Sequence, residues 1–172
     1  MILIALLLVI SGCGANNSTD DTTEAISLNQ VGEYSGAPYV YLNNNMPYFT
    51  DEKKENTKPF ENYSSLDDLG RCGVAFANIY KELMPTEERG PIGQIKPSGW
   101  HTVKYNGIID GNYLYNRCHL IGYQLTGENA NELNLITGTR YLNTEGMEGF
   151  ENTVGDYVAE MENHVVWEDT KL

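Results

Sequence analysis

The sequence predicts an α+β domain, in which short strands and long loops are combined with one or two helices. The strand evidence is clearest over residues 113–121, an apolar run that also contains an Arg and a His. The helix evidence is clearest over residues 147–161, where large apolar residues recur at helical spacing. Gly- and Pro-rich stretches between these segments predict loops, and the chain has no internal repeats.

The length and the charge limit what this domain can do. The chain has 172 residues and is 41% hydrophobic, which suits one globular domain with a real core. Its net charge of −13 should repel nucleic acid at long range. Any nucleic-acid function must therefore depend on a local site that is helped by a cation.

The first residues, MILIALLLVISGCG, have the features of a targeting segment. The apolar stretch is too short to span a bilayer, and it ends in small residues and Cys13. ISGC resembles a bacterial lipobox, so we expect a signal peptide over residues 1–12 and lipidation of Cys13. A plain secretory leader with a chance Cys is the alternative. Either leader predicts an extracytoplasmic protein, lipid-anchored at the cell surface or secreted.

A polar stretch that is poor in large apolar residues follows the leader. It predicts a flexible tether over residues 13–32 and a folded domain over residues 33–172. Within that domain, residues 39–42 predict a strand that runs into a turn at Asn43–Asn45. A polar surface stretch comes next. The apolar residues between 74 and 83 have mixed spacing, which fits a short helix or an irregular core segment ended by Pro85.

The second half begins with a long loop from about residue 86, followed by a hairpin that turns at residues 110–112. After the strand at 113–121 we expect a Gly- and Asn-rich loop and a short strand at 134–137. A turn at Gly138 and the helix then follow.

Side chains alternate between the faces of a strand, so Arg117 and His119 should stand side by side, about 7 Å apart. Cys118 should point the opposite way, which argues against a Cys–His nucleophile pair. A guanidinium beside a neutral imidazole suits an anionic substrate, because the positive charge disfavours protonation of the His. The simpler interpretation is a satisfied His at a sheet edge with Arg117 in solvent. Cys72 and Cys118 either pair or remain two buried thiols, and we expect the thiols.

The predicted helix carries polar side chains close to its apolar stripe. Glu151 lies closest to the stripe and Glu162 is next, whereas Glu148, Asp156 and Glu160 face away. Asn143, extrapolated back to the start of the helix, also falls on the stripe. Burial of polar groups without partners is costly, so a bound cation would explain both Asn143 and Glu151.

Strand, loop, strand and helix, with a His on the first strand and an Asn and a Glu on the helix, form the pattern of a ββα-metal (His-Me) finger. The stretches YNRCHLIGYQL, ENANELNLITGTRYLN and FEN resemble the DNA/RNA non-specific endonuclease family, in particular its competence-type DNA-entry nucleases and secreted DNases. The upstream stretch LDDLGRCGVAFANIYKELMPTEERGPIGQIKPSGWH looks like the same group, and the resemblance covers about residues 33–167. The family's Asp-Arg-Gly-His motif is replaced here by Asn116, Arg117, Cys118 and His119.

The resemblance implies a role for each site residue. His119 would be the general base, Asn143 the ligand of one Mg²⁺, with Mn²⁺ as a substitute, and Arg117 a contact to the scissile phosphate. Glu151 would hold water on the metal or ligate it directly, with Glu162 in reserve. The expected activity is sequence-non-specific hydrolysis of DNA, with RNA left open as a substrate, to 5′-phosphate products. We expect a monomer.

Other residues are weaker candidates. Asn134 either orients a ligand or caps a turn, and Arg140 is a candidate substrate contact. Arg89 and Lys96 could also contact phosphate, although solvent exposure is the default for such side chains. We expect His101 and His164 to be structural, and the scattered His residues predict no structural zinc.

Two features depart from the family pattern. Residues 128–169 contain ten acidic residues and one basic residue, Arg140, which favours single strands, short ends or a metal-screened approach. The family's central antiparallel sheet normally continues past the last predicted strand, so we expect a domain truncated at its C-terminus. A catalytically inactive surface-binding lipoprotein that keeps the nuclease fold is therefore the alternative function. A thiol hydrolase that uses Cys118 is a third, weaker hypothesis.

Overall fold

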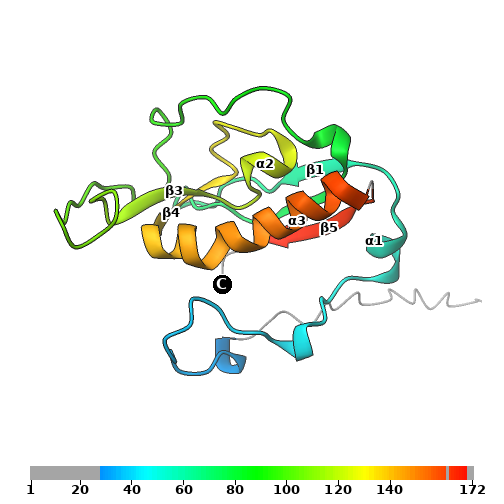
Figure 1. Cartoon of the computed structure of the whole chain (residues 1–172), viewed down its shortest axis with the longest axis horizontal. Coiled ribbons are helices and arrows are strands. Elements are labelled where there is room, and N and C mark those ends of the chain that lie inside the picture. The colour runs from blue at the N-terminus through cyan, green and yellow to red at the C-terminus, as the bar shows by residue number, and fades with distance from the viewer. Residues whose placement is uncertain (1–27, 162, 170–172) are drawn as a thin grey trace, which may run out of the picture.

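The computed structural model describes residues 28–161 and 163–169 (Figure 1). The leader, Cys13, most of the tether and Glu162 therefore lie outside the described residues. The strands are β1 (Phe60–Tyr63), β2 (Ala75–Ile79), β3 (Tyr115–His119), β4 (Leu135–Thr139) and β5 (Val165–Asp169), and the α-helices are α1 (Asp51–Glu55), α2 (Tyr123–Thr126) and α3 (Glu148–Met161). A π-helix at Leu142–Met147 precedes α3, and three short 3-10 helices cover Leu28–Gln30, Asn43–Asn45 and Lys81–Leu83. This mixture confirms the predicted α+β class.

The larger sheet is antiparallel, in the order β1-β2-β5. Its central strand β2 forms where the sequence indicated a short helix or an irregular segment, so that prediction was wrong. Ala75, Ala77 and Ile79 alternate into the core, and all three are fully buried. On the opposite face, Phe76 packs against the rings of Phe60 and Phe49. The small alanines of β2 do not form a recognisable apolar pattern, so the sequence did not predict this strand, which is covered on both faces.

The second sheet pairs β3 with β4 in antiparallel register, with Asn116 opposite Gly138 and His119 opposite Leu135. It confirms both predicted strands, but Gly138 lies inside β4, so the predicted turn there is wrong. A Cβ on Gly138 would come 2.6 Å from Cys118 Sγ. The absence of that Cβ leaves room for the buried side chain of Cys118.

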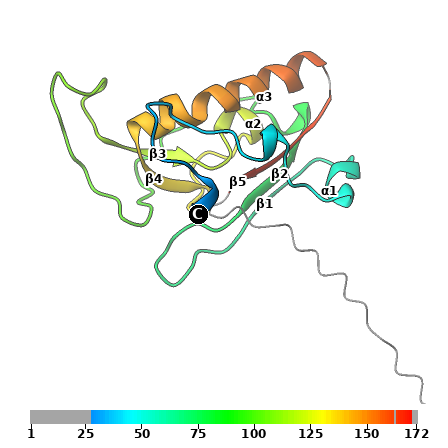
Figure 2. The same cartoon turned by 90° about the horizontal axis from the view of Figure 1, so that it is seen from below.

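Helix α3 lies across one side of both sheets (Figures 1 and 2). The predicted helix is confirmed, but its buried stripe is rotated from the predicted one. Val158, Gly155 and Glu151 are buried, whereas Phe150 and Met161 are exposed. Gly155 faces Leu125, and a Cβ there would be in ordinary van der Waals contact with it at 3.6 Å.

The hydrophobic core lies between α3, α2 and the inner faces of the sheets. Its fully buried side chains include Ile121, Leu125 and Val158. Trp167 on β5 joins the two sheets, since its indole Nε1 donates a 3.1 Å hydrogen bond to the carbonyl of Leu120 just after β3. The end of β3 is thereby fixed to the larger sheet.

The N-terminal part of the domain is less regular than predicted. Residues 39–42 form no strand, and Tyr39 instead packs edge-on against Phe150 of α3, with 4.8 Å between ring centroids. The turn at Asn43–Asn45 is confirmed, because all three asparagines have positive φ angles.

The region before β3 follows the prediction. A long loop without regular strands precedes a narrow turn. In this turn the backbone N–H of Tyr105 donates to the carbonyl of Asn112, and the N–H of Asn112 donates to the carbonyl of Ile109. Gly111 and Asn112 both have positive φ, which a tight turn at DGN requires. Over residues 28–161 and 163–169, no helix combines the length and apolarity needed to cross a membrane.

Candidate active site

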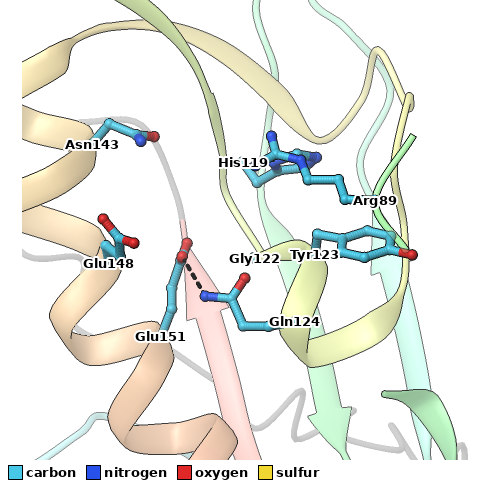
Figure 3. A pocket seen from close by; sticks show the side chains of 8 residues that line it. All are labelled: Arg89, His119, Gly122, Tyr123, Gln124, Asn143, Glu148 and Glu151. Carbon is cyan, nitrogen blue, oxygen red and sulfur yellow. Dashed lines mark hydrogen bonds between the residues drawn. The ribbon is translucent and has the colours of Figure 1, made fainter. Parts of the chain in front are cut away.

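A small pocket of about 100 Å³ lies between the end of β3 and the first turns of α3. Figure 3 shows two groups of side chains that face each other across it. Asn143, Glu148 and Glu151 come from the helical side, and His119 and Arg89 from the opposite side. The remaining lining residues are Gly122, Tyr123 and Gln124, at the start of α2.

His119 is buried, with 6% of its surface exposed, and both ring nitrogens have partners. Its Nε2 lies 2.8 Å from the carbonyl oxygen of Asn129. A carbonyl can only accept, so Nε2 carries the proton and Nδ1 keeps its lone pair. Burial lowers the pKa of His119 below its ordinary value, the Asn129 carbonyl raises it and the charge of Arg89 lowers it. The imidazole is therefore neutral near pH 7 and can accept a proton.

Arg89 reaches the pocket from the loop that follows the 3-10 helix at Lys81–Leu83. Its Nη2 donates to His119 Nδ1 over 3.4 Å, a long hydrogen bond. Arg89 is exposed at the surface, and it is the arginine among the residues that line the pocket. A guanidinium beside an imidazole at the mouth of a pocket can bind a phosphate with two parallel hydrogen bonds.

Glu151 is the buried carboxylate of the pocket, with 9% of its surface exposed. Its Oε2 accepts a 2.9 Å hydrogen bond from Gln124 Nε2. Gly122 makes this position possible, because a Cβ there would lie 2.7 Å from Glu151 Cδ. Burial raises the pKa of Glu151, as does the charge of Glu148, while the hydrogen bond from Gln124 and the charge of Arg89 lower it. A cation in the pocket would offset this unfavourable burial of charge.

Asn143 lies in the π-helix that precedes α3, and its carbonyl accepts the backbone N–H of Glu148. The wider turn adds one residue between them, which brings both side chains to the pocket together with Glu151. The expectation that Glu148 faces away from the core side is therefore corrected only in part. Its side chain is exposed, but it lines the pocket.

The donor atoms of this pocket fit a hard divalent cation. One amide and two carboxylates, from Asn143, Glu148 and Glu151, offer the oxygen ligands that Mg²⁺ prefers. In the described part of the chain, no cluster of three or more His, Cys, Asp and Glu side chains is arranged to hold a metal. A cation bound by one amide and two carboxylates would complete its coordination with water and substrate oxygens, as Mg²⁺ commonly does.

Three of the predicted site residues come together in this pocket, namely His119, Asn143 and Glu151. Arg117 does not line it and points instead into the loop at residues 93–100. Arg140 also lies elsewhere and forms a 2.7 Å ion pair with Asp110. Both amide atoms of Asn134 are bonded to the backbone of Ile121, which makes this fully buried residue part of the framework.

The remaining candidates occupy structural positions. His101 packs on the ring of Tyr115, and His164 stacks on Tyr80 with 4.8 Å between centroids. Cys72 and Cys118 do not form a disulfide, as expected, and both are buried. Burial raises the pKa of Cys118 to about 12, with a further contribution from Glu151, which disfavours the thiolate that a cysteine nucleophile requires.

The sequence interpretation gave too little weight to Arg89 and Glu148, and it did not identify Gln124 or Gly122. A signal for Glu148 was present, since residues three apart on a helix share a face with each other. Arg89 lies thirty residues before His119, in a loop with no periodicity. Only the folded chain brings Arg89 to His119.

An antiparallel strand pair followed by a helix, with His119 on the first strand and Asn143 and Glu151 on the helical side, defines the ββα-metal class of nuclease folds. Residues 50–169 match the family model described as DNA/RNA non-specific endonuclease. The chain belongs to this family.

Solved nuclease structures share the fold. The chain is similar to NucA from Streptococcus agalactiae with a magnesium ion bound, with a TM-score of 0.59, 24% identity and coverage of 68% of this chain. The same nuclease with no metal bound gives a TM-score of 0.57, 22% identity and 70% coverage. The Sda1 nuclease with a bound zinc ion gives a TM-score of 0.54 and 26% identity, and the match covers 69% of this chain.

The matched region covers 58% and 59% of the two NucA chains and 67% of Sda1. None of the curated proteins matches the chain significantly.

Proposed function

We propose that this protein is a divalent-metal-dependent, sequence-non-specific endonuclease that hydrolyses phosphodiester bonds of DNA, with RNA as a further substrate to be tested, and leaves 5′-phosphate ends. The observation that carries the proposal is the pocket itself. It sets a neutral, oriented imidazole opposite three oxygen donors, in a chain of the non-specific endonuclease family.

His119 is suited to the role of general base. The carbonyl of Asn129 fixes the Nε2–H tautomer, which directs the basic Nδ1 toward Arg89 and the pocket. Nδ1 takes a proton from the water that attacks phosphorus, a role that requires the neutral form of the ring. Because burial lowers the pKa of His119, that form predominates at neutral pH.

Arg89 is suited to hold the substrate, because it is the arginine that lines the pocket. Its hydrogen bond to Nδ1 is long and is made by one nitrogen, so a phosphate oxygen can replace it. The guanidinium then faces the phosphate that the attacking water must reach. Arg117 was expected in this role, and its contacts with the loop at residues 93–100 favour Arg89 instead.

Asn143, Glu148 and Glu151 are the residues that would hold Mg²⁺. When bound, the ion would stabilise negative charge on the phosphate and on the leaving 3′ oxygen. The magnesium ion in the NucA structure supports a site for this metal in the fold. Glu151 pairs with Gln124, which keeps its carboxylate directed into the pocket.

The direct test is cleavage of supercoiled plasmid by the full chain in mild detergent at neutral pH, with millimolar Mg²⁺ or with EDTA. Cleavage that requires both the metal and His119, judged with His119→Ala, supports the endonuclease. A folded protein that binds plasmid without cutting it would instead support the surface-binding lipoprotein. Single-stranded DNA and RNA in parallel reactions define the preferred substrate, and treatment of the ends with phosphatase and kinase identifies the phosphate position.

A second measurement separates metal binding from catalysis. Glu151→Gln keeps the size of the side chain and removes its charge. We expect weaker Mg²⁺ binding by calorimetry and slower cleavage that excess Mg²⁺ partly restores. Equal Mg²⁺ affinity in the variant and the parent would exclude Glu151 as a metal ligand.

We also propose that the protein acts outside the cytoplasm, anchored by a lipid on Cys13. The short apolar leader and the ISGC sequence support this proposal. Metabolic labelling with a radioactive fatty acid should mark the parent chain and not Cys13→Ser. Label on both chains would contradict the anchor.

A further inference from the structure

We propose that Arg117, the arginine of the Asn-Arg-Cys-His motif, is a positioning residue that holds the segment carrying Arg89 against His119. It would not contact the phosphate itself. This inference rests on the proposed endonuclease activity, and it assigns separate roles to Arg89 and Arg117.

The guanidinium of Arg117 is bound on several sides by one loop. Its Nη2 donates a 3.0 Å hydrogen bond to the carbonyl of Gly93, and its Nε donates to the carbonyl of Ile95. The indole of Trp100 covers the guanidinium, whose central carbon lies 3.7 Å from the ring centroid. Stacking on an aromatic ring and hydrogen bonds to carbonyls are both favourable for arginine. The guanidinium of Arg117 is therefore bound by the loop at residues 93–100.

The same segment is fixed again on the other side of Arg89. The hydroxyl of Tyr123, at the start of α2, donates a 2.7 Å hydrogen bond to the carbonyl of Glu87. Next to Arg89, Gly90 packs closely on the loop after α2, since a Cβ there would lie 3.0 Å from Asn129 Nδ2. Arg89 thus lies on a short span whose two ends, Glu87 and Gly93, are bound by Tyr123 and Arg117.

This arrangement matters because Arg89 itself is weakly held. Its side chain is exposed, and its hydrogen bond to His119 is long. A free arginine samples many rotamers, and ordering it when substrate binds costs free energy. Anchors at both ends of the span fix the backbone in advance. A displacement of about 1 Å at a site that positions substrate can reduce the rate roughly 100-fold.

A direct contact between Arg117 and phosphate predicts a different energetic pattern. Two arginines that each bind the substrate independently give additive losses when both are removed. An arginine that acts through Arg89 gives no further loss once Arg89 is absent. A double-mutant cycle on kcat/KM therefore separates the two roles.

The experiment uses the full chain in mild detergent, with plasmid and Mg²⁺, and compares Arg89→Ala, Arg117→Ala and the double variant. We expect Arg117→Ala alone to lower kcat/KM by roughly 10- to 100-fold. In the Arg89→Ala background, the same change should alter kcat/KM by no more than about twofold. Arg117→Lys should not restore the rate, because an ammonium cannot make the two carbonyl bonds and the stacking together.

Tyr123→Phe is the second variant, because it removes only the hydroxyl at the other anchor. It should lower kcat/KM in the parent and have little effect in the Arg89→Ala background. The matched control is Arg71→Ala, which removes an arginine that pairs with Asp67 on the surface at 2.8 Å. Its kcat/KM should match that of the parent, and thermal melts should show that each variant is folded.

Additive losses for Arg117→Ala and Arg89→Ala overturn the positioning role while leaving the endonuclease intact. If Arg117→Ala does not fold, the cycle between Tyr123→Phe and Arg89→Ala decides, and additivity there overturns the proposal. A parent chain that binds plasmid but never cuts it would contradict the proposed function instead.

Discussion

The two regions that α3 covers differ in how their buried groups are satisfied. Over the larger sheet, Val158 packs on a core of Ala77, Ile79 and other apolar side chains that are fully buried. Two helical turns earlier, Glu151 is also buried, but it faces His119 and Arg89 across a polar pocket. One face of one helix therefore supplies a hydrophobic contact at one end and a carboxylate that lines the pocket at the other.

This difference shows how the pocket is maintained. Burial of a polar group costs about 1–3 kcal/mol when its hydrogen bonds are incomplete. Burial of a side chain such as Val158 contributes about 1.5–3 kcal/mol in the opposite direction. The apolar end of α3 thus holds Glu151 in a position that its own contacts do not favour. Changes at the pocket should affect activity, and changes near the sheets should affect stability.

The largest expected effect compares two histidines, one in each region. His119→Ala removes the proposed base and should reduce plasmid cleavage by roughly 10²- to 10⁴-fold, with little change in the melting temperature. His164→Ala removes a ring that stacks on Tyr80 near the larger sheet, and cleavage should stay at the parent rate. Initial rates with excess Mg²⁺ provide the measurement. Equal losses in the two variants would mean that His119 acts only through the fold.

Two glycines provide the next comparison. In Gly122→Ala, the new Cβ meets the movable ends of Glu151 and Gln124, so they shift and cleavage should fall roughly tenfold or more. In Gly138→Ala, the new Cβ meets the buried Sγ of Cys118, and the free energy of unfolding should fall by about 1–3 kcal/mol. Urea unfolding and cleavage rates of both variants measure the contrast. Loss of activity without loss of stability in Gly138→Ala would contradict it.

The effect of pH on cleavage should be smaller than the effects of these substitutions, but it tests whether His119 is the base. His119 must be neutral to accept a proton. Burial lowers its pKa, the Asn129 carbonyl raises it by less, and the charge of Arg89 lowers it further. The rate should therefore hold at neutral pH and fall only below about pH 6.5, the ordinary value for histidine. Because Arg89 lowers this pKa, Arg89→Ala should move the acid limb to higher pH. An acid limb of the parent centred above pH 7 would argue against His119 as the base.

The smallest effect is expected from thiol-blocking reagents. Cys118 is fully buried and its pKa is raised to about 12, while Cys72 is nearly as buried. Iodoacetamide should therefore leave cleavage unchanged in the folded protein, and mass spectrometry should find both thiols unmodified until denaturant is added. Inactivation that parallels modification of Cys118 would support the thiol hydrolase hypothesis and contradict the role of His119 as the general base.

Much of the site could be predicted from sequence because its residues lie on regular elements close together in the chain. Strand alternation placed His119 and Cys118 on opposite faces, and helical periodicity singled out Glu151. The role of Arg117 could not be predicted in this way. Alternation placed it on the same face as His119, but its partners Gly93 and Ile95 belong to a loop more than twenty residues away. Strand β2 was missed because Ala75 and Ala77 are too small to mark a periodic apolar face.

The sequence by itself determined the α+β class, the ββα order of elements, and His119, Asn143 and Glu151 as candidate site residues. These features are local, since periods of two and 3.6 residues are properties of the backbone. Only the tertiary structure decided that Arg89 and Glu148 line the pocket, that Asn134 and Arg140 do not, and that Arg117 binds a loop. These contacts join distant segments, and their partners are selected by how the whole chain packs, which no short stretch of sequence specifies.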